Sequence, residues 1–148
     1  MEYQAQVDAY INLFNNLHHE LNRDAIRQLT DAQIRFVDPF NDVTGQPAFE
    51  AVLNHFRHQV EHPHFEIQQI AWSGRHYCLL RWEFSGRLKR LGWWQFPGVS
   101  EISLNDQGQI LMHRDHWDAG QFFYMKLPLV GSLLRWIRYQ IQRQSAKS

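Results

Sequence analysis

The densest group of chemically active side chains is the segment 112–118, with the sequence Met-His-Arg-Asp-His-Trp-Asp. Successive residues of a β-strand point to opposite faces of the sheet. As a strand, this segment places His113, Asp115 and Trp117 on one face. A histidine beside an aspartate in an apolar wall can form a hydrogen-bonded acid/base pair. The alternative is a set of cross-strand ion pairs on a solvated or dimer-facing surface.

Asp38 is a second candidate, because apolar residues flank it in the sequence Phe36-Val37-Asp38-Pro39-Phe40. Burial raises the pKa of a carboxyl group, as a general base that works near neutral pH requires. The alternative is a turn-forming aspartate, which is common before proline.

Apolar periodicity and turn residues predict the elements that must position these side chains. We expect helices at about 3–20, 23–29 and 47–60, where proline opens the third helix. We expect a loop at 41–45, strands from 65 to 118, turns at 73–75 and 105–108, and a break or bulge at Pro97-Gly98.

Helices followed by consecutive strands and a terminal helix predict an α+β fold. We expect a cone-shaped curved antiparallel sheet packed against three N-terminal helices, plus a C-terminal helix. Aromatic residues make up 14% of the chain and include six Trp. Rings in this number must line a core or a cavity, and aromatic walls suit apolar or planar ligands.

Several motifs, in this order and spacing, resemble the ketosteroid isomerase and nuclear-transport-factor-2-like (NTF2-like) superfamily, including its SnoaL-like polyketide cyclase branch. They are Tyr10, the segment 36–39, Gly45 with Phe49, and the segments 82–87 and 105–110. The resemblance covers about residues 3–118. It implies an NTF2-like domain at 1–124, and we expect a basic amphipathic helix at 125–148 as part of the same domain. It also implies a homodimer through the convex sheet face.

The resemblance also implies roles for individual residues. Asp38 matches the general base of the isomerases, and Tyr10 matches their oxyanion-hole tyrosine. Ser100, or Glu101 after a one-residue slip, falls where the second oxyanion donor stands. Asp115 resembles the catalytic acid of the polyketide cyclases, and His113 would polarise it. The remaining pocket positions fall on Phe14, Phe56, Trp82 and Trp117.

These residues lead to three hypotheses about function. The first is an isomerase or cyclase that moves a proton next to a carbonyl group of an apolar or aromatic small molecule. The second is a binding module without chemistry, because Ser100 stands where an isomerase keeps a carboxylic acid. The third is a peripheral membrane or protein-interaction domain that acts through the C-terminal helix.

Composition narrows the partners and the compartment. Lys and Arg number 15, as do Asp and Glu, so we expect no general electrostatic binding of nucleic acid. The single cysteine, Cys78, and the start Met1-Glu2-Tyr3-Gln4, which lacks the regions of a signal peptide, predict a cytoplasmic protein. We expect no cofactor and no metal, since His58 and His62 lack a third ligand.

The C-terminal segment is chemically distinct from the rest of the chain. Residues 125–148 contain five basic residues and no acidic residue. Leucine and isoleucine recur there at helical spacing among the arginines, with Trp136 and Tyr139 between them. A basic amphipathic helix can bind a membrane surface. The alternative is that it packs on its own domain, as a lid, or on a dimer mate.

Overall fold

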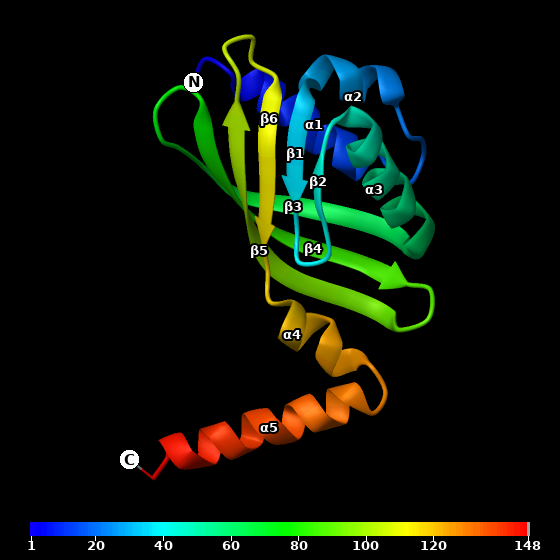
Figure 1. The fold of residues 1–148 in the computed structure, drawn as a ribbon, viewed down its shortest axis with the longest axis vertical. Helices are drawn as coiled ribbons and strands as arrows, with labels where there is room; N and C mark the ends of the chain where they lie inside the picture. The colour runs from blue at the N-terminus through cyan, green and yellow to red at the C-terminus, as the bar shows by residue number, and fades with distance from the viewer. Residues whose placement is uncertain (148) are drawn as a thin grey trace. The chain divides into compact units, whose positions relative to one another are not determined.

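A six-stranded sheet dominates residues 1–117 of the computed structural model, which describes residues 1–147 (Figure 1). Its strands are β1 (Thr30–Val37), β2 (Asp42–Thr44), β3 (Val60–Trp72), β4 (Tyr77–Leu88), β5 (Gly92–Leu104) and β6 (Ile110–His116). Their order across the sheet is β2-β1-β6-β5-β4-β3. All neighbours are antiparallel except β1 and β6, which are parallel. The α+β prediction is confirmed, and the sheet is mixed rather than wholly antiparallel.

Three helices precede or interrupt the strands: α1 (Gln4–Asn15), α2 (Arg23–Leu29) and α3 (Gln46–Gln59). The first helix ends earlier than its apolar periodicity predicted. Asn15 at its end pairs with the backbone of Phe65 on β3, donating to its carbonyl at 3.1 Å and accepting from its N–H at 2.8 Å. The helix end is therefore fixed to the edge strand of the sheet, and the chain turns away after it.

Two local predictions were wrong. Residues 42–44 form the short strand β2, because this segment pairs with the end of β1, where Phe36 lies opposite Val43. The pairing of β4 with β5 also continues without a break through Pro97 and Gly98. Gly98 lies opposite Trp82, and a Cβ atom there would come within 2.2 Å of the Trp82 ring. The glycine therefore makes room for an indole and does not mark a bulge.

The inner face of the bent sheet is filled with side chains. On β4, the alternating residues Cys78, Leu80, Trp82 and Phe84 are all buried, as the period of two predicts. Phe84 lies within 5.4 Å, centroid to centroid, of the rings of Phe65, Trp94 and Phe96. Burial raises the pKa of the Cys78 thiol to about 11.

Residues 118–147 form a second compact unit. It contains α4 (Ala119–Phe122), the short 3-10 helix η1 (Tyr124–Lys126) and α5 (Val130–Ser145). Gly131 packs against the carbonyl of Met125, so closely that a Cβ atom would collide with it. The guanidinium of Arg135 donates a hydrogen bond to that same carbonyl. No helix within residues 1–147 is long and apolar enough to cross a membrane.

Candidate functional site

Five polar side chains form one continuous hydrogen-bonded network inside the sheet. Trp82 Nε1 donates to Ser100 Oγ at 2.8 Å, and Ser100 Oγ donates to Asp115 Oδ1 at 2.5 Å. From the other side, His113 Nε2 lies 2.6 Å from Asp115 Oδ1. His113 Nδ1 lies 2.8 Å from the hydroxyl of Tyr10 on α1. The alternation predicted for β6 therefore holds, and Asp115 is the point at which both branches meet.

One arrangement of protons satisfies every hydrogen bond of this network. Burial and the negative charge of Asp115 raise the pKa of Tyr10 well above its ordinary value, so its hydroxyl keeps its proton. Among residues 1–147 this hydroxyl has His113 Nδ1 as its hydrogen-bond partner, and it donates its proton when Nδ1 is the acceptor. In the tautomer with Nδ1 as acceptor, Nε2 carries the ring proton and donates it to Asp115. The hydroxyls of Tyr10 and Ser100 therefore both donate their hydrogen bonds within the network, to His113 and Asp115.

Replacing Tyr10 with phenylalanine is expected to lower the free energy of unfolding by about 1–3 kcal/mol, because His113 Nδ1 loses its buried partner. Urea denaturation measures the change. Tyr3→Phe is the matched control, since the Tyr3 hydroxyl donates to the carbonyl of Asp106 at 2.9 Å in a partly exposed turn. Equal losses of unfolding free energy in Tyr10→Phe and Tyr3→Phe would contradict the prediction that the buried hydroxyl of Tyr10 contributes more to stability.

Asp38 forms the turn between β1 and β2. Its Oδ1 accepts from the backbone N–H of Phe40 at 2.8 Å, and from the backbone and side chain of Asn41 at 2.7 and 3.0 Å. Asp38 is therefore a turn-forming residue, as the alternative interpretation predicted. Its burial and its pKa nevertheless set it apart from an ordinary turn aspartate. Asp38 is half-buried, and burial raises its pKa against the opposing effect of these donors. The charge of Asp115 adds to the increase.

The raised pKa of Asp38 predicts a specific pH dependence of stability. The folded protein holds this proton more tightly than the unfolded chain, so stability falls as pH rises through the interval above about 3.9. Asp38→Asn keeps an acceptor oxygen and removes the charge. We expect the variant to be more stable than the wild type at neutral pH and equal to it in acid, as measured by urea denaturation across pH.

Asp42→Asn serves as the control for this comparison and should give the opposite sign. The hydrogen bonds from Arg35 lower the pKa of Asp42, so its charge stabilises the folded state above the unfolded pKa. The variant should lose stability at neutral pH. If Asp38→Asn and Asp42→Asn changed the free energy of unfolding in the same direction at neutral pH, the environment of Asp38 would not oppose its charge.

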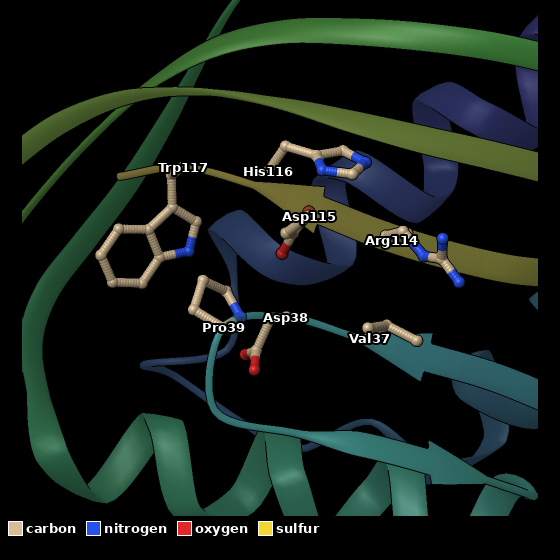
Figure 2. Close-up of a pocket in the computed structure, with 7 residues that line it drawn as sticks. All are labelled: Val37, Asp38, Pro39, Arg114, Asp115, His116 and Trp117. Atoms are coloured by element: carbon tan, nitrogen blue, oxygen red, sulfur yellow. The ribbon is translucent and has the colours of Figure 1, made fainter. Parts of the chain in front are cut away.

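Asp38 and Asp115 both line an open hollow of about 580 Å³ at the end of the parallel pair β1 and β6 (Figure 2). Pro39 and Trp117 stand at one side of it, and Val37 and Arg114 at the other. Asp38 and Asp115 each use Oδ1 to accept hydrogen bonds, and no described residue donates to either Oδ2. The hollow therefore exposes two carboxyl groups whose second oxygens are available to a ligand.

A second, inner cavity lies behind Asp115 and has a volume of only about 30 Å³. Tyr10, Phe14, Trp82, Ser100 and His113 line it. Such a volume holds a water molecule. It is far below the roughly 300–1,000 Å³ of small-molecule sites. The aromatic interior of the sheet is thus a packed core around a small void, and the space for a ligand lies outside it.

The remaining candidate residues lie in different parts of the structure. Trp117 stacks on Phe96, with ring centroids 4.2 Å apart, and lines the outer hollow. Phe56 lines neither cavity and packs on Phe65 and Phe84. Glu101 lies on the opposite face, where its carboxylate accepts from Tyr77 and pairs with His116. The one-residue slip that would bring Glu101 into the site therefore does not occur.

Sequence reasoning missed several residues that shape the site. Phe65, Ile67 and Leu80 line the inner cavity, and all three alternate with exposed neighbours along β3 and β4. That period of two was a usable signal. Val37, Pro39 and Arg114 line the outer hollow only because β1 and β6 are adjacent, and no local pattern reveals that pairing.

The bent sheet with helices α1–α3 is an NTF2-like fold, as the solved structures show. An NTF2-like protein of unknown function from Exiguobacterium sp. 255-15 has 19% identity and a TM-score of 0.68, covering 76% of this chain and 98% of that one. An LEH-like epoxide hydrolase from M. tuberculosis has 20% identity and a TM-score of 0.67, covering 82% and 86%. A candidate SnoaL-like polyketide cyclase from Jannaschia sp. CCS1 has 17% identity and a TM-score of 0.64, covering 76% and 85%.

The chain belongs to the SnoaL-like domain family, whose model matches residues 7–113. This match spans α1 through the middle of β6 and so includes Tyr10, Asp38, Ser100 and His113. The resemblance deduced from the motifs is confirmed. No curated protein sequence matches the chain significantly.

Proposed function

We propose that the protein is an enzyme that moves a proton at a carbon next to a carbonyl group of a planar or apolar small molecule bound in the outer hollow. One observation carries the proposal. Asp115 is fixed through Oδ1 by Ser100 and His113, while the residue lines the same hollow as Asp38. A carboxylate held on one oxygen presents the other in a defined direction, as a positioned general base requires.

The two carboxyl groups have different environments, which assigns them different roles. Asp115 acts as the base: its Oδ2 takes the proton, and the electrons of the broken C–H bond pass into the enolate. Asp38, whose pKa burial raises, holds a proton more readily and donates it to the enolate oxygen. This exchanges the roles that the family resemblance implied. Asp115 then returns its proton to another carbon while the enol oxygen gives its proton back to Asp38, which re-forms the carbonyl group and completes an isomerisation.

The place of the substrate follows from the volumes. The inner cavity of about 30 Å³ is too small, whereas the outer hollow of about 580 Å³ has the size of a small-molecule site. The indole of Trp117 and the ring of Pro39 border the two carboxyls there (Figure 2). They offer apolar contact to a flat ligand. Two structures of the same fold are described as an LEH-like epoxide hydrolase and a candidate SnoaL-like polyketide cyclase, which supports a small-molecule site.

A ligand-binding module without chemistry is the second candidate, and one observation favours it. The hydroxyls of Tyr10 and Ser100 donate to His113 and Asp115, so neither has a proton to offer an enolate oxygen. In that case Asp38 alone would have to stabilise the developing charge. A binding module needs no such donor.

Hydrogen–deuterium exchange at carbon separates the two candidates. Cyclic enones and aromatic polyketide-like ketones are incubated with the protein in deuterium oxide, and NMR follows loss of the protons next to the carbonyl. An enzyme should accelerate exchange of at least one compound above the rate in buffer. Compounds that bind, as shown by shifts of protein resonances around Trp117, but exchange only at the buffer rate would establish the binding module.

A further inference from the structure

The helix α5 carries an exposed apolar stripe that the proposed catalytic function does not use. The stripe consists of Val130, Leu133, Leu134, Ile137 and Ile141, which fall on one side of the helix at 100° per residue. The exposed fractions of Leu133, Ile137 and Ile141 are 57%, 41% and 60%. A contiguous apolar surface of this kind marks an interaction site.

The charges around the stripe identify the partner. Between Ala119 and Lys147 the chain has five basic residues and no Asp or Glu. Arg138 lies beside the stripe on one flank, and the half-exposed indole of Trp136 lies on the other. Tryptophan at the edge of an apolar face is typical of helices at the membrane–water interface. Positive charge without any acid complements the phosphates of anionic lipids.

The arginines do not all have the same freedom to contact a partner. Arg135 donates to the carbonyl of Met125 and to Ser132 Oγ, so it holds the start of α5 in place. Arg143 lies over the ring of Tyr139, 5.8 Å from its centroid. Arg138 makes no hydrogen bond or ion pair with any residue among 1–147. Arg138 and Arg143 are therefore the charges available to lipid.

We propose that α5 is a membrane-surface anchor that lies flat on a bilayer containing anionic lipid, with the α5 stripe in the acyl boundary and Arg138 and Arg143 at the phosphates. Its 16 residues give a length of about 24 Å. A helix of this length and charge binds along the surface and does not span the bilayer. This role is independent of the proposed chemistry.

Vesicle co-sedimentation of the full-length protein tests the anchor. Vesicles of pure phosphatidylcholine are compared with vesicles that contain equal amounts of phosphatidylcholine and phosphatidylglycerol. We expect binding to the mixed vesicles only, weakened by added salt. Arg138→Gln combined with Arg143→Gln should lower the partition coefficient roughly 25-fold, since each charge contributes about five-fold. The control Arg87→Gln with Arg90→Gln removes one charge from the end of β4 and one from the β4–β5 turn, and should change binding less than about two-fold.

A second variant with its own control tests how much the apolar side chains of the α5 stripe contribute to vesicle binding. Ile137→Gln with Ile141→Gln should lower binding to mixed vesicles by about ten-fold or more. Tyr139→Gln removes an exposed ring from the opposite side of α5, where its contact is with Arg143, and should lower binding much less than the stripe variant. Equal binding to both vesicle types, or equal losses in the control variants, would overturn the proposal. Absence of binding to any vesicle, with stripe variants that change the mass of the protein in solution, would instead assign the stripe to a second copy of the chain.

Discussion

Replacing Asp115 with asparagine is expected to lower the rate of enzyme-catalysed proton exchange by about 10²–10⁴-fold, the usual contribution of a positioned acid or base. The amide oxygen of asparagine can still accept from Ser100 and His113, so the network of the site is kept. The group that faces the hollow changes from a basic oxygen to an amide without basicity. NMR-detected exchange of the best compound gives the rate.

The control and the stability of the variant decide how such a loss is interpreted. Asp24→Asn alters an exposed aspartate in the first turn of α2, far in the fold from the hollow, and should leave the rate unchanged. Urea denaturation should show that Asp115→Asn still folds. If Asp38→Asn abolished exchange while Asp115→Asn did not, the base would be Asp38, as the family resemblance implied. If neither variant lowered the rate, the carboxyl groups would have no part in the chemistry.

Replacing Gly98 with alanine is expected to lower the free energy of unfolding by about 2–4 kcal/mol. The added methyl would stand 2.2 Å from Cη2 of Trp82, which is buried against Phe65 and Phe96. A movement of the indole that relieves the clash would disturb its hydrogen bond to Ser100, to which Nε1 donates at 2.8 Å. Urea denaturation measures the loss.

Two comparisons test whether the clash with Trp82 causes this loss of stability: a glycine-to-alanine change at another position, and a double-mutant cycle. Gly120→Ala adds a methyl on α4, where its nearest neighbour is Asp118 Oδ1 at 3.3 Å, and should be close to neutral. In a Trp82→Leu background the clash is removed, so Gly98→Ala should then cost much less. A cost that stays unchanged in that background would mean that the strand itself, and not the indole, requires glycine at this position.

Local patterns predicted the parts of the fold that depend on neighbours in sequence. The bounds of α2, the alternation of β4, and the common face of His113 and Asp115 all follow from periodicity, because periodicity directly reports which side of an element is buried. The end of α1 could not be found in this way. It depends on the pairing of Asn15 with Phe65, which lies fifty residues further along the chain.

The chemistry of the site was only partly predictable for the same reason. The sequence pattern placed Asp115 beside His113, but nothing local indicated that Ser100 and Trp82 reach the same carboxylate from β5 and β4. Gly98 was a visible signal that we interpreted as a bulge. A glycine within a strand also marks a close approach of another group, and here that group is an indole.

The parallel pairing of β1 with β6 also has a consequence for the order of folding. Phe36 lies beside His113, so the pair joins segments from opposite ends of the first unit, and its formation closes a long loop. Such pairings carry a high entropic cost and tend to form late. Asp38 and Asp115 come together only through this pair. Intermediates that hold the β3–β4–β5 meander alone would therefore have native-like strands without the hollow, and recovery of ligand binding in the hollow would report the final step of refolding.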